Sequence, residues 1–295
     1  MSLLRDYPYP YKPMLVQTAY RIPKRGHIAM VKMDGFRCLL YYDQQKGIRL
    51  YTRHLNDCTA SFPELQQITL PYRKIILDGE IVVLEKGKPN FEDAIKRLKN
   101  QKHAETLAKQ LPAHFAAFDV LYLEGPLYQT QLQERLHLLN RIKLPEPLFV
   151  CPSHPNGEEL FDAVKNMGLE GIVSKAVTSP WIPDCRPAYW KKTKNFSRTE
   201  VSILAIQKRG FGWLIGNDER TLGVLGVKNV PASARLQLGS LKHEIKRSED
   251  EDWYWLHRGI RCIVKHMDFY RSGQLREPTF ETFCLPEALE RKQAK

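Results

Sequence analysis

The sequence of 295 residues predicts an α+β protein, in which a larger domain built on antiparallel sheets precedes a smaller all-β domain. Up to about residue 190, β-rich runs alternate with amphipathic stretches, whereas the last third consists mostly of short, turn-linked β-rich runs. Between the two lies the segment 191–199, which is basic and polar and contains no aliphatic residue. We therefore expect two domains, residues 1–198 and 199–295.

In the first domain, Pro8, Pro10 and Pro13 predict an extended strap at the start of the chain. Strands are expected at 27–31, 38–43, 48–53, 74–85 and 113–123. Helices are expected at 62–68, 91–110, 131–142 and 157–167, and the charged residues of 91–110 should form a solvated face. The two longest strands carry acids inside apolar runs, at Asp78-Gly79-Glu80 and at Asp119. Because buried strands are otherwise apolar, these acids are candidates for a functional site.

In the second domain, the strand pattern recurs at 201–206, 211–215, 222–227, 253–257 and 259–268, with a charged stretch at 242–252. Five or so strands in roughly 95 residues fit a compact barrel such as the OB-fold. The chain shows no internal repeat and no low-complexity tract.

The composition is strongly basic. Lysine and arginine number 45 against 33 aspartates and glutamates, which gives a net charge of +12. This balance favours a polyanionic partner, with nucleic acid ahead of an anionic membrane surface. The six cysteines form no Cys-x-x-Cys pair, which excludes zinc-ribbon spacing and argues against a disulfide framework. No signal-peptide core and no run of membrane-spanning length is present, so we expect a cytoplasmic protein without membrane attachment.

One lysine stands out in the segment Val31-Lys32-Met33-Asp34-Gly35-Phe36-Arg37, between two strand-like runs. The Asp-Gly pair after it predicts a tight turn, because glycine tolerates positive φ and aspartate bonds its own backbone. A lysine held in this way at the mouth of a sheet is a candidate nucleophile for a phosphorus or carbonyl centre. A hairpin with a solvated lysine is the alternative that these residues alone leave open.

Two later stretches also place charge at strand ends. Glu170 and Lys175 stand at opposite ends of one apolar run, and Lys192 and Lys194 share one face of the next, since side chains in a strand repeat every second residue. Any of these groups alone is equally consistent with a solvated strand end. Together with Lys32, they provide a nucleophile, cations for a phosphate and carboxylates suited to a hard metal ion. Magnesium bound by one or two carboxylates and substrate phosphates needs such a set.

The chain carries a set of motifs in a fixed order: Lys32-x-Asp34-Gly35-x-Arg37, Asp78-Gly79-Glu80, Phe118-Asp119, Glu170-Gly171 and Lys192-x-Lys194. This order resembles the nucleotidyltransferases that form a covalent lysyl-NMP, and it looks most like the ATP-dependent DNA ligases in a minimal two-domain form. Thr52-Arg53 and the segment 273–280 are similar to further stretches of that family. The resemblance implies an adenylation (nucleotidyltransferase) domain over 1–198 and an OB-fold domain over 199–295.

The resemblance also implies a reaction. Lys32 would attack the α-phosphate of ATP, AMP would pass to a DNA 5′-phosphate, and the 3′-hydroxyl would then seal the nick. Mg²⁺ would be the metal, held with help from Glu170, and nicked double-stranded DNA would be the partner of a monomer. Arg53 would contact a DNA phosphate.

The nucleotide-binding residues follow from the same resemblance. Lys192 and Lys194 would contact the α-phosphate, Arg37 and Glu80 would hold the ribose side, and Phe118 would stack on adenine. The positive charges of Lys192 and Lys194, together with desolvation, are expected to lower the pKa of Lys32 from about 10.4.

Two positions depart from the family pattern. Met30 stands where the family has a glutamate near the adenine amine. Phe283 is followed by Cys284-Leu285-Pro286-Glu287 in place of an Arg-x-Asp-Lys run, which predicts slow self-adenylation with unimpaired sealing. The alternatives are an RNA ligase or GTP-dependent capping-type enzyme, and a ligase-like DNA-binding protein with poor turnover.

Overall fold

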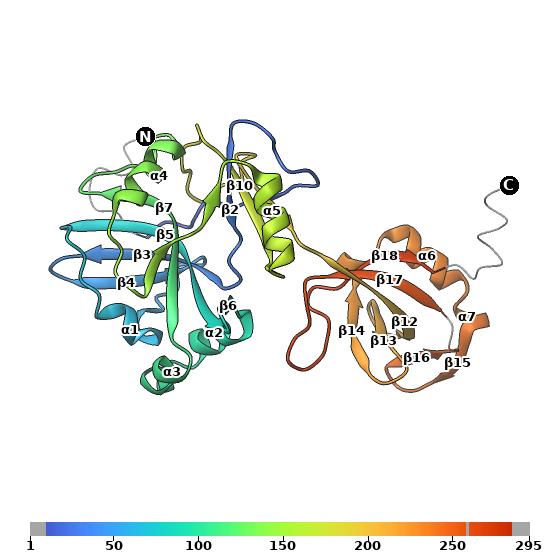
Figure 1. The fold of residues 1–295 in the computed structure, drawn as a ribbon. Coiled ribbons are helices and arrows are strands. Elements are labelled where there is room, and N and C mark those ends of the chain that lie inside the picture. The colour runs from blue at the N-terminus through green and yellow to red at the C-terminus, as the bar shows by residue number, and fades with distance from the viewer. Residues whose placement is uncertain (1–9, 258–259, 285–295) are drawn as a thin grey trace. The chain divides into compact units, whose positions relative to one another are not determined.

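The computed structural model describes residues 10–257 and 260–284 (Figure 1). The chain divides into two compact units, Met1–Asn195 and Phe196–Lys295. Each unit has its own cluster of buried apolar side chains. Within the described ranges, no helix is both long enough and apolar enough to cross a membrane.

Two sheets make up the framework of the described part of the first unit. The strands of one are β3 (Phe36–Asp43), β4 (Gly47–Thr52), β5 (Lys74–Glu85), β6 (Lys88–Pro89), β7 (Ala113–Leu123) and β8 (Leu148–Val150). Their order is β4-β3-β5-β7-β8, with β6 paired to β5. The strands of the other are β1 (Gln17–Thr18), β2 (His27–Val31), β9 (Ser153–His154), β10 (Gly171–Ala176) and β11 (Trp190–Lys194). Their order is β1-β11-β10-β2-β9. The strands predicted at 27–31, 74–85 and 113–123 are confirmed with the same bounds.

The helices of this unit are α1 (Pro63–Gln66), α2 (Phe91–Lys99), α3 (Ala104–Gln110), α4 (Leu132–Arg141) and α5 (Gly157–Asn166). Helix α4 packs on β7, and α5 packs on β2 and β10 (Figure 1). The prediction of one helix over 91–110 is wrong, because α2 ends at Lys99 and Asn100 is its C-cap residue. The side-chain amide of Asn100 donates to the Lys96 carbonyl at 2.7 Å and so competes with the backbone donor that would continue the helix.

The expected solvated face of α2 is wrong at Arg97, which is fully buried. Its guanidinium donates to both carboxylate oxygens of Glu64, at 2.6 and 2.9 Å, and to the carbonyls of Ser61 and Leu111. Glu64 also accepts from the backbone N–H of Ala113, the first residue of β7, at 2.9 Å. This buried ion pair therefore fixes α2 against α1 and β7.

The segment around Lys32 joins the two sheets, because β2 belongs to one and β3 to the other. The hairpin alternative is therefore wrong. The reason for glycine in the turn also differs from the prediction, since Gly35 does not have a positive φ. A Cβ at Gly35 would lie 2.0 Å from the carbonyl oxygen of Ile81 on β5. Only glycine allows this close approach of the two backbones.

The second unit is built on one seven-stranded sheet. Its strands are β12 (Ser197–Gln207), β13 (Gly212–Gly216), β14 (Thr221–Gly226), β15 (Lys246–Glu249), β16 (Trp253–Leu256), β17 (Arg261–His266) and β18 (Thr279–Phe283). The long strand β12 pairs with β13, β16 and β17, and the core forms around Trp213. The helices α6 (Ala232–Ser240) and α7 (Lys242–Ile245) were not predicted, because α6 contains a glycine and two serines, which are poor helix formers.

Candidate active site

A cavity of about 640 Å³ lies in the first unit and is lined by residues from both of its sheets. The residues predicted from the sequence that line it are Lys32, Arg37, Arg53, Glu80, Phe118 and Lys192. Glu170 and Lys194 are not part of the wall, but Glu170 contacts Lys32, and Lys194 contacts Glu170. The fold thus brings together residues from the two ends of the first unit.

Lys32 follows the last residue of β2, and one acid holds its ammonium group. Its Nζ donates to Oε2 of Glu170 at 2.6 Å, and Nζ of Lys194 lies 3.7 Å from Oε1 of the same carboxylate. The backbone fixes this arrangement, because the N–H of Lys32 donates to the carbonyl of Gly171 at 2.9 Å. The side chain of Lys32 keeps 22% exposure, so its amine remains within reach of a ligand.

The expected depression of the lysine pKa is wrong. Burial does lower the pKa of Lys32, but the charges of Glu170, Glu80 and Asp34 together raise it above its ordinary value. Burial also raises the pKa of Glu170, against the opposing charge of Lys32, and raises the pKa of Glu80 to about 8. The acids close to Lys32 therefore outweigh the effect of burial on its pKa.

The two acids of Asp78-Gly79-Glu80 have different surroundings. Glu80 lines the cavity, whereas Asp78 is fully buried and does not reach out from its strand as expected. Arg37 donates to both oxygens of Asp78, at 2.9 and 2.5 Å, and to the carbonyl of Met14 at 2.5 Å. The indole N–H of Trp181 donates to the same carboxylate at 2.9 Å. Asp78 therefore orients Arg37 toward the cavity.

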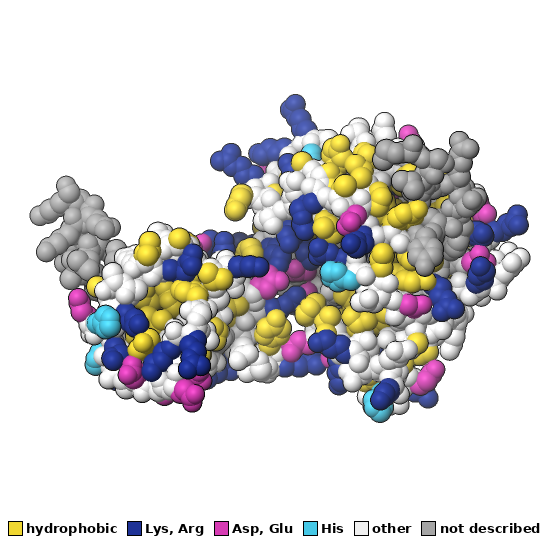
Figure 2. Space-filling view, turned by 180° about the vertical axis from the view of Figure 1, so that it is seen from behind, with side chains coloured by type: hydrophobic (Ala, Val, Ile, Leu, Met, Phe, Trp, Pro, Cys, Tyr) yellow, Lys and Arg dark blue, Asp and Glu magenta, His cyan; other side chains and the backbone are white. Residues whose placement is uncertain are grey.

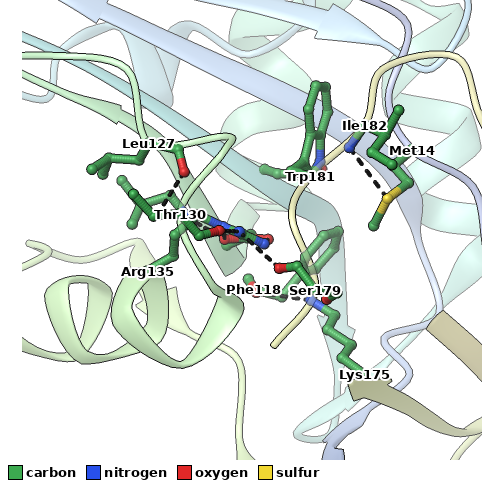
Figure 3. Close-up of polar contacts among 12 residues, drawn as sticks. Met14, Phe118, Leu127, Thr130, Arg135, Lys175, Ser179, Trp181 and Ile182 are labelled. Carbon is green, nitrogen blue, oxygen red and sulfur yellow. Dashed lines mark hydrogen bonds and ion pairs between the residues drawn. The ribbon is translucent and has the colours of Figure 1, made fainter. Parts of the chain in front are cut away.

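Lys175 lines the cavity but was not among the predicted site residues. It is 2% exposed, and its ammonium donates to the carbonyl of Phe118 at 2.9 Å (Figure 3). The same ammonium lies 4.2 Å from the ring centroid of Phe118 and 4.0 Å from that of Trp190. Burial lowers the pKa of Lys175 to about 8, although Asp119 and Asp78 oppose the shift. Its sequence signal was its place at the end of the run from Glu170, which alone does not reveal burial.

Asp119, the acid inside β7, is fully buried and paired with Arg135 of α4. Arg135 donates to its two oxygens at 2.8 and 2.9 Å and to the carbonyls of Thr130 and Ser179 at 2.5 and 3.2 Å (Figure 3). This network ties α4 and the segment around Ser179 to β7. It therefore fixes the neighbouring residue Phe118, which faces the cavity.

Across the described ranges, no group of three or more His, Cys, Asp or Glu side chains is placed to hold a metal ion by itself. The carboxylates of Glu170 and Glu80 nevertheless lie close to Lys32. Because Mg²⁺ often takes one or two carboxylates and completes its shell with phosphates and water, this donor set fits magnesium together with a nucleotide.

Comparison with known proteins places the chain in a family. The family model described as "ATP dependent DNA ligase domain" matches residues 13–194. The SPbeta prophage-derived DNA ligase-like protein LigB of Bacillus subtilis (strain 168) is 34% identical over 88% of this chain and 93% of its own length. The chain belongs to the ATP-dependent DNA ligase family. DNA ligase 1 of Korarchaeum cryptofilum is 30% identical over 69% of this chain, and the match covers 40% of that longer protein.

Solved ligase structures share the fold. The ligase domain of LigD from M. tuberculosis aligns with 93% of this chain and 95% of its own, with a TM-score of 0.58 and 24% identity. A Lig E DNA ligase aligns with 94% of this chain and all of its own, with a TM-score of 0.64 and 18% identity. The prediction of an ATP-dependent DNA ligase, with an adenylation domain on antiparallel sheets and an all-β OB-fold domain, is confirmed.

The sequence departs from the family pattern at Met30 and in the segment that follows Phe283. Met30, which stands where the family has a glutamate, is buried on β2 and lines the cavity of this ligase. Phe283 is the last residue of β18, and Cys284 is the last described residue. Leu285, Pro286 and Glu287 lie outside the described residues.

Proposed function

We propose that this ligase seals nicks in duplex DNA, with ATP as the nucleotide and Lys32 as the residue that carries AMP. The observation that supports the proposal most strongly is the position of Lys32 beside a cavity that also presents Arg37, Phe118 and Lys192. A volume of about 640 Å³ lies within the range of small-molecule sites, and the wall combines apolar surfaces with a few charged groups, as such sites do.

The first step requires Lys32 to lose a proton, and Glu170 is the base placed to take it. Its Oε2 accepts from the lysine Nζ at 2.6 Å, and burial raises the pKa of its carboxyl group, which makes it a stronger base. The amine then forms a P–N bond with the α-phosphorus of ATP, and pyrophosphate leaves with the electrons of the broken P–O bond. Lys192 and Lys194 offset charge on the phosphate oxygens.

The remaining steps move AMP onto DNA and off again. A DNA 5′-phosphate oxygen attacks the phosphorus of the lysyl-AMP, which frees the amine of Lys32 and leaves a DNA-adenylate. The 3′-hydroxyl then attacks the 5′-phosphorus, closes the phosphodiester and releases AMP. Phe118 stacks on adenine, while Arg37 and Glu80 hold the ribose side.

Magnesium would be held by Glu170, with Glu80 nearby and most ligands from the phosphates and water. It would offset negative charge on the phosphate oxygens. Both oxygens of Glu170 face ammonium groups, at 2.6 Å from Lys32 and 3.7 Å from Lys194. Binding of the ion at Glu170 therefore requires the proton taken from Lys32 to pass on to solvent, because only the carboxylate form of Glu170 would hold a cation.

The DNA would be held by the basic surface. Lysine and arginine side chains are spread over the face drawn in Figure 2, and the net charge is +12. Arg53 is exposed at the cavity and is placed to contact a DNA phosphate. We propose a monomer that acts in a reducing compartment such as the cytoplasm, which suits the free thiols of its described cysteines.

A sealing assay on a nicked duplex tests this proposal. Wild-type protein with ATP and Mg²⁺ should convert the nicked strand to full length, whereas Lys32→Ala should form neither lysyl-AMP nor product. Lys143→Ala, which removes an exposed lysine of the same unit, is the matched control and should seal normally. A preference for GTP, or for a nick in RNA, would instead favour the capping-type or RNA-ligase alternative. Binding to DNA without any lysyl adduct would favour a DNA-binding protein without turnover.

A further inference from the structure

A surface loop of the first unit has the composition of a DNA contact. It joins β1 to β2 over residues 19–26, and its sequence is Ala-Tyr-Arg-Ile-Pro-Lys-Arg-Gly. Tyr20 is 96% exposed, and the next most exposed large apolar side chain of the described ranges, Leu236, is 75% exposed. Tyrosine rings are usually packed against other groups. Because nearly all of the Tyr20 side chain is exposed, its ring is available to a partner.

The loop is anchored at both ends and in the middle. The N–H of Ala19 donates to the carbonyl of Lys192 on the cavity wall at 2.9 Å, and the carbonyl of Gly26 accepts from Val177 at 3.0 Å. Ile22, between them, packs against the apolar cluster under α5. The backbone on either side of Tyr20 is therefore fixed, and less conformational entropy is lost when a partner binds.

Three cations follow the exposed ring of Tyr20 within the loop. Arg21 precedes the anchor residue Ile22, Lys24 and Arg25 follow it, and all three cations are exposed. The Nζ of Lys24 also lies 3.5 Å from a carboxylate oxygen of Glu158, in the first turn of α5. An exposed aromatic ring next to lysine and arginine side chains is typical of surfaces that stack on bases and bind the nucleic-acid backbone.

The number of residues between the loop and the cavity limits how far from the nick the loop can contact DNA. Val16 lines the cavity, and Tyr20 follows it by four residues, so their Cα atoms are at most about 14 Å apart. Phosphates of one DNA strand recur roughly every 3.4 Å along the helix axis. A nick held at the cavity mouth therefore places the loop within about four nucleotides of the break.

We propose that the loop 19–26 binds the DNA strand beside the nick, with the ring of Tyr20 packed on a nucleoside and Arg21 and Arg25 on phosphates. The proposal rests on the proposed nick-sealing function and adds a DNA-binding element outside the cavity. A nick breaks the sugar–phosphate backbone of one strand, so the bases beside it can separate more easily than in an intact duplex and offer a face to an aromatic ring. Loss of the loop contacts weakens DNA binding and leaves self-adenylation of Lys32 unchanged.

The test measures affinity for a pre-adenylated nicked duplex by fluorescence anisotropy. Tyr20→Ala should weaken binding by about 5- to 150-fold, the range for loss of one base–aromatic stack, while Tyr20→Phe should stay within about twofold. The double variant Arg21→Ala/Arg25→Ala should lower the slope of log affinity against log salt by about two. Met167→Ala and Arg141→Ala, which remove an exposed apolar group and an exposed cation elsewhere in the unit, are the controls and should match wild type.

Two further readouts separate this proposal from the proposed function. All variants should form lysyl-AMP from ATP at the wild-type rate. Tyr20→p-benzoylphenylalanine should crosslink within about four nucleotides of the nick. If wild type seals nicks and Tyr20→Ala binds them within twofold of wild type, the loop proposal is wrong and the function stands. A wild-type protein that neither forms lysyl-AMP nor binds nicked DNA would overturn both.

Discussion

Replacement of Lys175 by methionine tests the electrostatics of the cavity. Burial lowers the pKa of Lys175 from 10.5 to about 8 in the folded protein. Between these pH values the unfolded chain binds a proton that the folded protein has lost, so the free energy of unfolding of wild type rises with pH in this window. At about 1.4 kcal/mol per pKa unit, the full rise from this one group is about 3 kcal/mol.

The assay is urea unfolding of wild type and Lys175→Met at about pH 7 and about pH 9.5, with reductant present. The stability difference between the two proteins should change by about 2 kcal/mol between these pH values, in favour of wild type at the higher pH. The carbonyl of Phe118 loses its donor in the variant, which adds a constant cost of about 1–3 kcal/mol. Lys143→Met is the exposed control and should follow the wild-type curve. If wild type and Lys175→Met show the same pH dependence, Lys175 is not the neutralised group inferred here.

Three other predictions concern the ion pairs and the reaction steps. Arg135→Met leaves the carboxylate of Asp119 buried without its partner and should lower the free energy of unfolding by about 3–5 kcal/mol. Adding Asp119→Leu to this variant should restore part of the loss, as measured by thermal unfolding of the single and double variants. Glu170→Gln removes both the proposed base and the largest charge that raises the pKa of Lys32. Lysyl-AMP formation should therefore be slower, and its pH profile should move to lower pH; an unchanged or more alkaline profile would refute the assigned cause of the pKa shift. In single-turnover assays, adduct formation from ATP should be slow and sealing of a pre-adenylated nick should not, because an Arg-x-Asp-Lys run is missing after Phe283. Fast adenylation with slow sealing would contradict that reasoning.

Much of the fold follows from local sequence. The continuous apolar runs of β5 and β7 predict their bounds, and the apolar spacing of α4 predicts a helix of nearly the observed length. The break at Asn100 was not predictable, because it depends on a side-chain hydrogen bond that competes with an otherwise helical pattern. The need for Gly35 was predicted for the wrong reason, since the close contact comes from Ile81, which lies 46 residues later in the chain.

The candidate site was predictable as a set of residues but not in its electrostatics. Asp78 and Glu80 cannot be told apart from the sequence. Only the structure shows that Asp78 is buried and accepts hydrogen bonds from Arg37 and Trp181. The pKa of Lys32 depends on Glu170, which lies 138 residues away in sequence. Such pairings arise from tertiary packing, which periodicity and spacing do not encode.

The central claim is that Lys32 carries AMP from ATP to DNA, and a pulse–chase experiment with α-labelled ATP tests it most directly. The purified protein should take up label on a single lysine, and peptide mapping should identify that residue as Lys32. Addition of a nicked duplex should transfer the label to the 5′-phosphate end of the DNA and then release it as AMP as the strand is sealed. Label on a different residue, such as Lys175 or Lys192, or a Lys32 adduct that does not pass to DNA, would contradict the account.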